Sequence, residues 1–126
     1  MFYPENLNAK GKIGIEDFTV TDDGYLRTET DGATLTVTFT GTSLKIWTYA
    51  GHPASILEYT VDNGEKKSIT LDKSSDNHKI YKIADGLTDT NHTVKMTFKK
   101  STGLKVDIRY FLITGETNGK AFSITN

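Results

Sequence analysis

The chain has 126 residues, a net charge of −1 and no cysteine, so it has the length of one domain and forms no disulfide or thiolate metal site. Its 15 basic and 16 acidic residues are well mixed, which leaves no basic patch for nucleic acid or an anionic membrane surface. No basic segment followed by an apolar run opens the chain, and no stretch reaches the roughly 20 apolar residues of a membrane span. We therefore expect a single domain over residues 1–126, without a signal peptide and with neither nucleic acid nor membrane as its partner.

Apolar and polar side chains alternate with the two-residue period of β-strands over most of the chain, and no window has the spacing of an amphipathic helix. The alternation predicts strands, in chain order, over residues 33–39, 44–49, 55–62, 69–71, 80–83, 93–98 and 104–112. The core-facing positions that follow from it include Leu35, Val37, Phe39, Val94, Met96, Phe98, Val106 and Ile108. In the last strand the same alternation continues to Tyr110 and Leu112, which places Phe111 on the opposite face.

Turn signals that contain glycine separate these segments. The strongest is Asn63-Gly64, because this dipeptide readily adopts the positive φ angles of a tight hairpin turn. Eight or nine short strands with frequent turns predict an all-β fold, a two-sheet antiparallel β-sandwich of the jelly-roll type. The polar segment 115–126 is either a loose C-terminal tail or a final edge strand.

Three short segments together form a recognisable pattern: residues 39–44 (FTGTSL), 59–64 (YTVDNG) and 86–94 (GLTDTNHTV). In this order they resemble the non-catalytic jelly-roll domain that precedes the hydrolase domain of SGNH-type carbohydrate esterases. Related carbohydrate-binding modules occur in bacterial surface proteins and in phage tail and baseplate proteins. Nothing in the chain resembles the nucleophile block or the distal Asp-x-x-His of the esterases. The resemblance therefore implies the accessory role without the esterase chemistry.

The residues of these three motifs fit structural roles better than binding roles. We expect Gly41 to turn the chain between two strands, and Asp62 to cap the Asn63-Gly64 turn by accepting backbone N–H bonds. His92 precedes a strand, where an imidazole bonded to the neighbouring loop explains it. No binding residue of the family is carried over to this chain.

The histidines give little support to catalysis. His52, His78 and His92 lie in separate turn regions, and no nucleophile elbow accompanies them. We therefore expect that the chain is not an enzyme. A small esterase is the alternative, and it requires a serine within hydrogen-bond reach of a histidine.

No cofactor is expected, with one structural calcium ion as the alternative. Asp17, Asp22 and Asp23 are the best oxygen ligands for it, since calcium favours several carboxylates and carbonyls. The competing interpretation is that Asp22-Asp23-Gly24 forms an ordinary turn.

Aromatic residues give the most specific candidate site. Trp47 and Tyr49 occupy the face of their strand opposite Leu44 and Ile46, so an inward position of the two aliphatic residues turns both aromatic rings outward. Two such rings at strand spacing form a platform on which the C–H face of a sugar can stack, and His52 in the following loop adds a polar group. The alternative is that another segment covers this face and that Trp47 belongs to the core.

These observations predict a non-catalytic carbohydrate-binding, or adhesion, module with carbohydrate as its ligand. We expect it in a phage tail or baseplate or in a bacterial surface protein, hence in a virion or at the cell surface as part of a larger protein or assembly. The competing function is structural, a sandwich that docks neighbouring domains or subunits. An exposed aromatic cleft favours binding, whereas a flat apolar patch favours assembly.

Overall fold

The computed structural model describes residues 16–21, 25–49, 55–71, 78–100, 105–114 and 122–125, and all regular secondary structure in these ranges is β. The strands are β1 (Thr19–Val20), β2 (Leu26–Thr28), β3 (Ala33–Gly41), β4 (Ser43–Tyr49), β5 (Ser55–Val61), β6 (Lys67–Leu71), β7 (His78–Ala84), β8 (Thr90–Lys100), β9 (Val106–Thr114) and β10 (Phe122–Thr125). The described ranges hold ten strands, against the eight or nine expected, and two of them, β1 and β2, have only two and three residues and are too short to produce an alternation.

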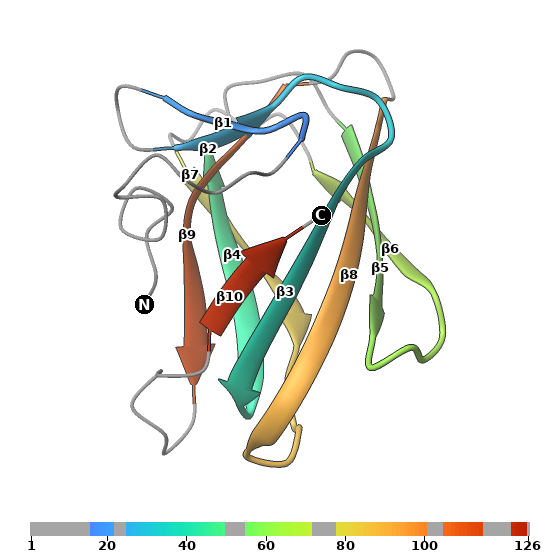
Figure 1. The fold of residues 1–126 in the computed structure, drawn as a ribbon, viewed down its shortest axis with the longest axis vertical. Helices are drawn as coiled ribbons and strands as arrows, with labels where there is room; N and C mark the ends of the chain where they lie inside the picture. Colours follow the sequence, from blue (N-terminus) through green and yellow to red (C-terminus); the bar gives the residue numbers. More distant parts are fainter. Residues whose placement is uncertain are drawn as a thin grey trace.

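The strands form two five-stranded antiparallel sheets. Sheet A has the order β1-β2-β9-β4-β7, and sheet B has the order β10-β3-β8-β5-β6. Figure 1 shows the sheets face to face, with β10, β3 and β8 of sheet B in front of β4 and β7 of sheet A. The predicted two-sheet antiparallel sandwich of the jelly-roll type is confirmed.

The core lies between the sheets and is built from the alternate residues of each strand. All eight residues predicted to face inward are at most 4% exposed, and the aliphatic side chains at 44 and 46 are fully buried. Such side chains each contribute about 1.5–3 kcal/mol when removed from water. Phe18 closes one part of this core and packs edge-on against Phe98, with ring centroids 5.9 Å apart.

One predicted face is wrong, at the end of β9. The pairing of β9 with β4 shifts between Trp47 and Thr48, so that Trp47 lies opposite Tyr110 while Thr48 lies opposite Ile108. Arg109 is therefore the extra residue of a β-bulge, which reverses the alternation after it. Phe111 is fully buried in the core in consequence, and Tyr110 is on the outer side of sheet A.

Gly41 lies where the chain passes from sheet B to sheet A. Residue 41 still pairs with β8, whereas Ser43 already pairs with Thr114 of β9. A Cβ atom at Gly41 would lie 2.6 Å from the carbonyl oxygen of Thr114 and 2.8 Å from Cγ2 of Ile113. The expected role of Gly41 as a turn between strands is thus sharpened: glycine is needed here for a close backbone approach.

The hairpin predicted at Asn63-Gly64 joins β5 and β6, but its turn is centred one residue earlier. The N–H of Gly64 donates to the carbonyl of Val61 at 2.9 Å. Asp62 and Asn63, the two central residues, have φ angles of 53° and 61°, as a type I′ turn requires. This geometry sends the Asp62 side chain toward β8.

Residues 122–125 form β10, which pairs with β3 at the edge of sheet B. Of the two interpretations of segment 115–126, the final edge strand therefore applies to these four residues. Residues 115–121 and 126 lie outside the described ranges.

Candidate functional site

The outer face of sheet A carries the aromatic residues that the sequence singled out. Leu44 and Ile46 face the core with no exposed surface, so the alternation of β4 turns Trp47 and Tyr49 outward. Trp47 is partly exposed and Tyr49 is 36% exposed. Trp47 therefore lies on the outer surface of the sheet, not between the two sheets.

Neighbouring strands add further rings to this surface. Tyr110 packs edge-on against Trp47, with ring centroids 4.5 Å apart, because the bulge at Arg109 turns it to the same side. Tyr25, directly before β2, makes a similar edge contact with Tyr49 at 6.3 Å. The Arg109 guanidinium lies over the Tyr25 ring, 5.3 Å from its centroid. These contacts hold the rings in fixed positions.

An exposed aliphatic residue completes the surface on the other side of Trp47. Ile80 of β7 lies opposite Trp47 in the sheet and is 50% exposed. We call the group formed by Tyr25, Trp47, Tyr49, Ile80 and Tyr110 on the outer side of sheet A the aromatic face; Tyr110 is only 6% exposed and supports Trp47 from the side. The amino-acid pattern does not reveal that residues 25, 80 and 110 belong to this face, because their membership depends on which strands are neighbours and on the bulge.

Of the remaining predicted site residues, only Asp17 lies within the described ranges. His52 lies outside the described ranges, as do Asp22 and Asp23, so their parts in a glycan or calcium site stay predictions. Asp17 lies in an exposed turn with a φ of 69°. In the part of the chain that is described, no three His, Asp or Glu residues cluster as metal ligands do.

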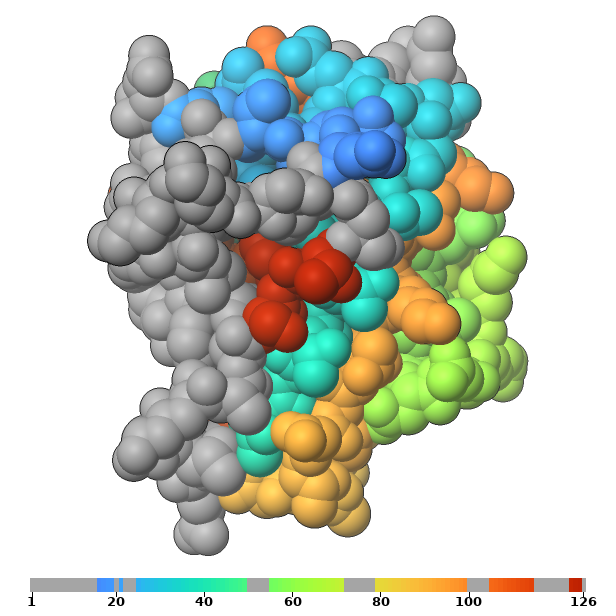
Figure 2. Space-filling model, in the orientation of Figure 1, coloured from blue at the N-terminus to red at the C-terminus, as the bar shows by residue number. Residues whose placement is uncertain are grey.

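The outer face of sheet B differs in chemistry from the aromatic face. Figure 2 shows it with β10, β3, β8, β5 and β6 side by side. Its outward positions on the two central strands carry hydroxyls above all, from Thr34, Thr36, Thr38, Thr40, Thr93 and Thr97. Among the described outward residues of this sheet there is no aromatic ring. The two faces of the sandwich therefore offer different surfaces to a ligand.

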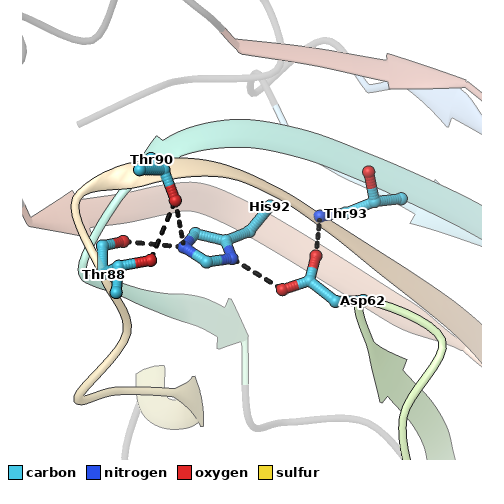
Figure 3. Close-up of polar contacts among 5 residues, drawn as sticks. All are labelled: Asp62, Thr88, Thr90, His92 and Thr93. Atoms are coloured by element: carbon cyan, nitrogen blue, oxygen red, sulfur yellow. Dashed lines mark hydrogen bonds and ion pairs between the residues drawn. The ribbon is translucent and has the colours of Figure 1, made fainter.

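A second polar cluster joins the hairpin after β5 to the start of β8 (Figure 3). Nδ1 of His92 lies 2.6 Å from the Asp62 carboxylate, and Nε2 lies 2.7 Å from the carbonyl oxygen of Thr88. The second carboxylate oxygen of Asp62 accepts the backbone N–H of Thr93 at 2.8 Å. Asp62 was expected to cap its own turn, but its carboxylate bonds across to β8 instead. His92 is the structural imidazole that was predicted.

The same contacts set the protonation of this pair. Burial by itself lowers the pKa of the His92 imidazole, but its hydrogen bonds to Asp62 and Thr88 outweigh this, so the pKa of His92 is raised. The hydrogen bond from His92, together with that from the Thr93 N–H, lowers the pKa of Asp62. Both partners are therefore favoured in their charged forms.

The cluster contains a hydroxyl, an imidazole and a carboxylate, yet it lacks the arrangement of a catalytic triad. Thr90 Oγ1 lies 3.4 Å from Nε2 of His92, but Nε2 donates its proton to the Thr88 carbonyl at the shorter distance. A base must have a free lone pair on that nitrogen to activate a hydroxyl. His92 in this state holds the loop and has no lone pair for catalysis.

The three resembling segments meet around this cluster. The N–H of Leu87 donates to the carbonyl of Thr42, and the ring of Phe39 packs against His92 at 5.8 Å. Thr40 Oγ1 donates to the side chain of Asn91, the residue opposite it in the sheet. The motifs thus stabilise one end of the sandwich, which is the structural role expected of them.

Within the described ranges there is no helix long and apolar enough to span a membrane.

The described strands thus form a jelly-roll sandwich with an aromatic outer face on sheet A. Comparison with protein families agrees with this class: the Carbohydrate esterase 2 N-terminal family matches residues 18–120. The chain belongs to this family, the non-catalytic N-terminal domain of family two carbohydrate esterases. No curated protein matches the chain.

Solved structures share the fold at low identity. A family two carbohydrate esterase from Cellvibrio japonicus superimposes with a TM-score of 0.71 and 18% identity over 89% of this chain and 32% of the esterase. A family two carbohydrate esterase from Clostridium thermocellum, in complex with cellohexaose, superimposes with a TM-score of 0.67 and 18% sequence identity over 83% of this chain and 30% of that esterase. TmCBM61 in complex with β-1,4-galactotriose superimposes with a TM-score of 0.56 and 12% sequence identity over 92% of this chain and 99% of that one. The chain thus spans about a third of the length of the esterases and nearly the whole length of TmCBM61.

Proposed function

We propose that the chain is a non-catalytic carbohydrate-binding module whose glycan stacks on the aromatic face of sheet A. The observation that carries the proposal is the outward orientation of Trp47 and Tyr49 on adjacent outward positions of β4. Its support comes from the family, and from similar structures that are described as complexes with cellohexaose and β-1,4-galactotriose. Neither glycan is assigned to this chain by that likeness.

The geometry of the face suits sugar stacking. Outward residues two positions apart on a strand are separated by roughly 7 Å, so two rings engage one extended glycan in successive contacts. Tyr110 and Tyr25 hold Trp47 and Tyr49 by edge contacts, which reduces the conformational entropy lost on binding. Arg109 over the Tyr25 ring supplies hydrogen-bond donors at the border of the rings.

The setting that we propose is extracellular, within a larger protein or assembly. The chain corresponds to 32% of the Cellvibrio japonicus esterase, the size of one domain in that protein. A bacterial surface protein and a phage tail or baseplate are the two settings in which such a module places a larger assembly on a glycan surface.

A second function, docking of a neighbouring domain or subunit, is favoured by one observation. Ile80 is 50% exposed at the β7 edge of the aromatic face, and an exposed aliphatic side chain beside a tryptophan is typical of protein contacts. The same surface thus serves both hypotheses, and substitutions separate them.

The experiment compares Tyr49→Ala, Trp47→Ala and Ile80→Ser on a glycan array, with Thr36→Ala on the outer face of sheet B as the control. Stacking predicts that both aromatic variants lose the glycan signal, while Ile80→Ser and Thr36→Ala keep it. Tyr49→Ala should shift the thermal midpoint little because Tyr49 is at the surface, and Trp47→Ala should cost about 0.5–1.5 kcal/mol through the lost edge contact with Tyr110. Glycan binding that survives both aromatic substitutions in folded protein contradicts the proposal.

A further inference from the structure

A cleft of about 250 Å³ opens at the side of the sandwich, where the last strands of the two sheets contribute to the same wall. Lys67 comes from β6, the edge of sheet B, and Lys82 comes from β7, the edge of sheet A. The cleft has no lining residue in common with the aromatic face.

Apolar side chains and charged side chains line the cleft in similar measure, and one phenol hydroxyl lies among them. Tyr59, Val61 and Leu87 line it, and Tyr59 is only 7% exposed. The Tyr59 hydroxyl forms no hydrogen bond with the residues that the structure describes, and it is not one of their buried unpaired atoms, so it reaches the open side of the cleft. This hydroxyl is therefore available to a molecule in the cleft, and burial raises its pKa so that it keeps its proton.

Lys67 occupies a position where the strand pattern calls for an apolar residue. It lies opposite Tyr59 in the sheet, on the core-facing side of β6 that continues with Ile69 and Leu71. Lys67 makes no ion pair with the described part of the chain. An inward lysine on an edge strand discourages pairing with another sheet. That role explains the charge, but it does not explain the cleft into which both Lys67 and the Tyr59 hydroxyl open.

The lining charges do not cancel. Lys82 forms an ion pair with Asp85 at 3.1 Å, which leaves the Lys67 ammonium as the excess charge of the cleft. Ligand pockets for larger molecules measure about 300–1,000 Å³, so this cleft suits a smaller group. An ammonium and a phenol beside apolar side chains match a sugar ring that carries an anion.

We infer that this cleft binds a single sugar ring with an anionic substituent, a carboxylate or a sulfate. The Lys67 ammonium takes the anion, the Tyr59 hydroxyl donates to a ring or acid oxygen, and the C–H face of the ring lies on Val61 and Leu87. The site is separate from the aromatic face and stands whether or not that face binds glycans.

The test is an NMR titration of the ¹⁵N-labelled chain with glucuronic acid, galactose 6-sulfate and glucose. The acidic sugars should shift the amides of residues 59–67 and 82–87, and glucose should not. A response to glucuronic acid alone identifies a carboxylate ligand, and a response to the sulfated sugar alone identifies a sulfate ligand. Shifts by none of the three, or equal shifts by all three, overturn the inference.

Variants distinguish this site from the aromatic face. Lys67→Gln should weaken binding of the acidic sugar about tenfold, since one charged hydrogen bond is lost. Tyr59→Phe keeps the packing and should weaken it by a smaller factor. The matched control is Lys66→Gln, which removes the neighbouring ammonium that pairs with Glu58 at 3.7 Å outside the cleft. Trp47→Ala should leave this binding unchanged; loss with Lys66→Gln or Trp47→Ala, or none with Lys67→Gln, contradicts the site.

Discussion

His92 of β8 and Asp62 of the β5–β6 turn are joined by a hydrogen bond of 2.6 Å between Nδ1 and a carboxylate oxygen. The opposite nitrogen of the same ring faces the carbonyl oxygen of Thr88 at 2.7 Å. A carboxylate and a carbonyl are both acceptors, so the ring satisfies them only when both nitrogens carry a proton. The imidazolium form is therefore part of the folded structure.

The first prediction is that this pair makes stability depend on pH at both ends of a window. The pKa of His92 is raised, so its contribution is complete below the ordinary value of about 6.5 and is lost as pH rises through the folded value. The pKa of Asp62 is lowered, so its contribution is complete above about 3.9 and is lost as pH falls. Urea unfolding across pH should show the largest contribution between about pH 4 and 6.5.

The substitution Asp62→Asn isolates the cause. It removes the carboxylate that favours the imidazolium, so the pKa of His92 measured by NMR should fall, and the alkaline loss of stability should shift with it. Asp85→Asn removes an exposed carboxylate that pairs with Lys82, and it should leave the titration of His92 unchanged. A pKa of His92 below that of a free imidazole in the wild-type chain would contradict the assigned proton positions.

The second prediction concerns the centre of the core. Phe98 has no exposed surface and packs against Phe18, so Phe98→Ala should lower the free energy of unfolding by about 3–5 kcal/mol. Thr97→Ala changes the preceding residue, whose side chain points outward, and should cost about 0.5 kcal/mol or less. Urea denaturation measures both, and similar costs would mean that the strand register is off by one residue.

The third prediction distinguishes two reasons why a position requires glycine, a positive φ at Gly86 and a close backbone contact at Gly41. Gly86 has a φ of 66° with open space around it, so Gly86→Ala should cost about 1–2 kcal/mol and Gly86→Asn less, because asparagine tolerates this conformation. At Gly41 the obstacle is the backbone of Thr114, so Gly41→Ala should cost about 1–3 kcal/mol and Gly41→Asn no less. Thermal unfolding of the four variants tests this, and a rescue by asparagine at Gly41 would refute the steric explanation.

The fourth prediction uses the fact that the chain has a single tryptophan, so its intrinsic fluorescence reports on the aromatic face alone. Acrylamide should quench Trp47 emission in the folded protein, and a bound glycan should reduce that quenching. Tyr49→Ala removes the neighbouring ring and should abolish the protection while leaving quenching of the free protein in place. Emission that acrylamide cannot reach in the folded chain would show that Trp47 is covered.

The amino-acid pattern alone is sufficient for the class of fold and for most of the core. Alternation over β3 and β8 places Leu35, Phe39, Met96 and Phe98 inward, because side chains on a strand must point to opposite faces and one of the two faces is buried. The same logic turns Trp47 and Tyr49 outward once Leu44 and Ile46 are in the core.

Only the tertiary structure decides which distant residues share a surface. Nothing local to β9 marks the bulge at Arg109, because a bulge exists only relative to the partner strand, and it exchanges Tyr110 and Phe111 between the outer face and the core. Asp62 and His92 are 30 residues apart and meet because β5 and β8 are neighbours in sheet B. Likewise Lys67 and Lys82 line one cleft because the edges of two sheets come together. Local pattern fixes the direction of a side chain, whereas strand order and register fix its neighbours.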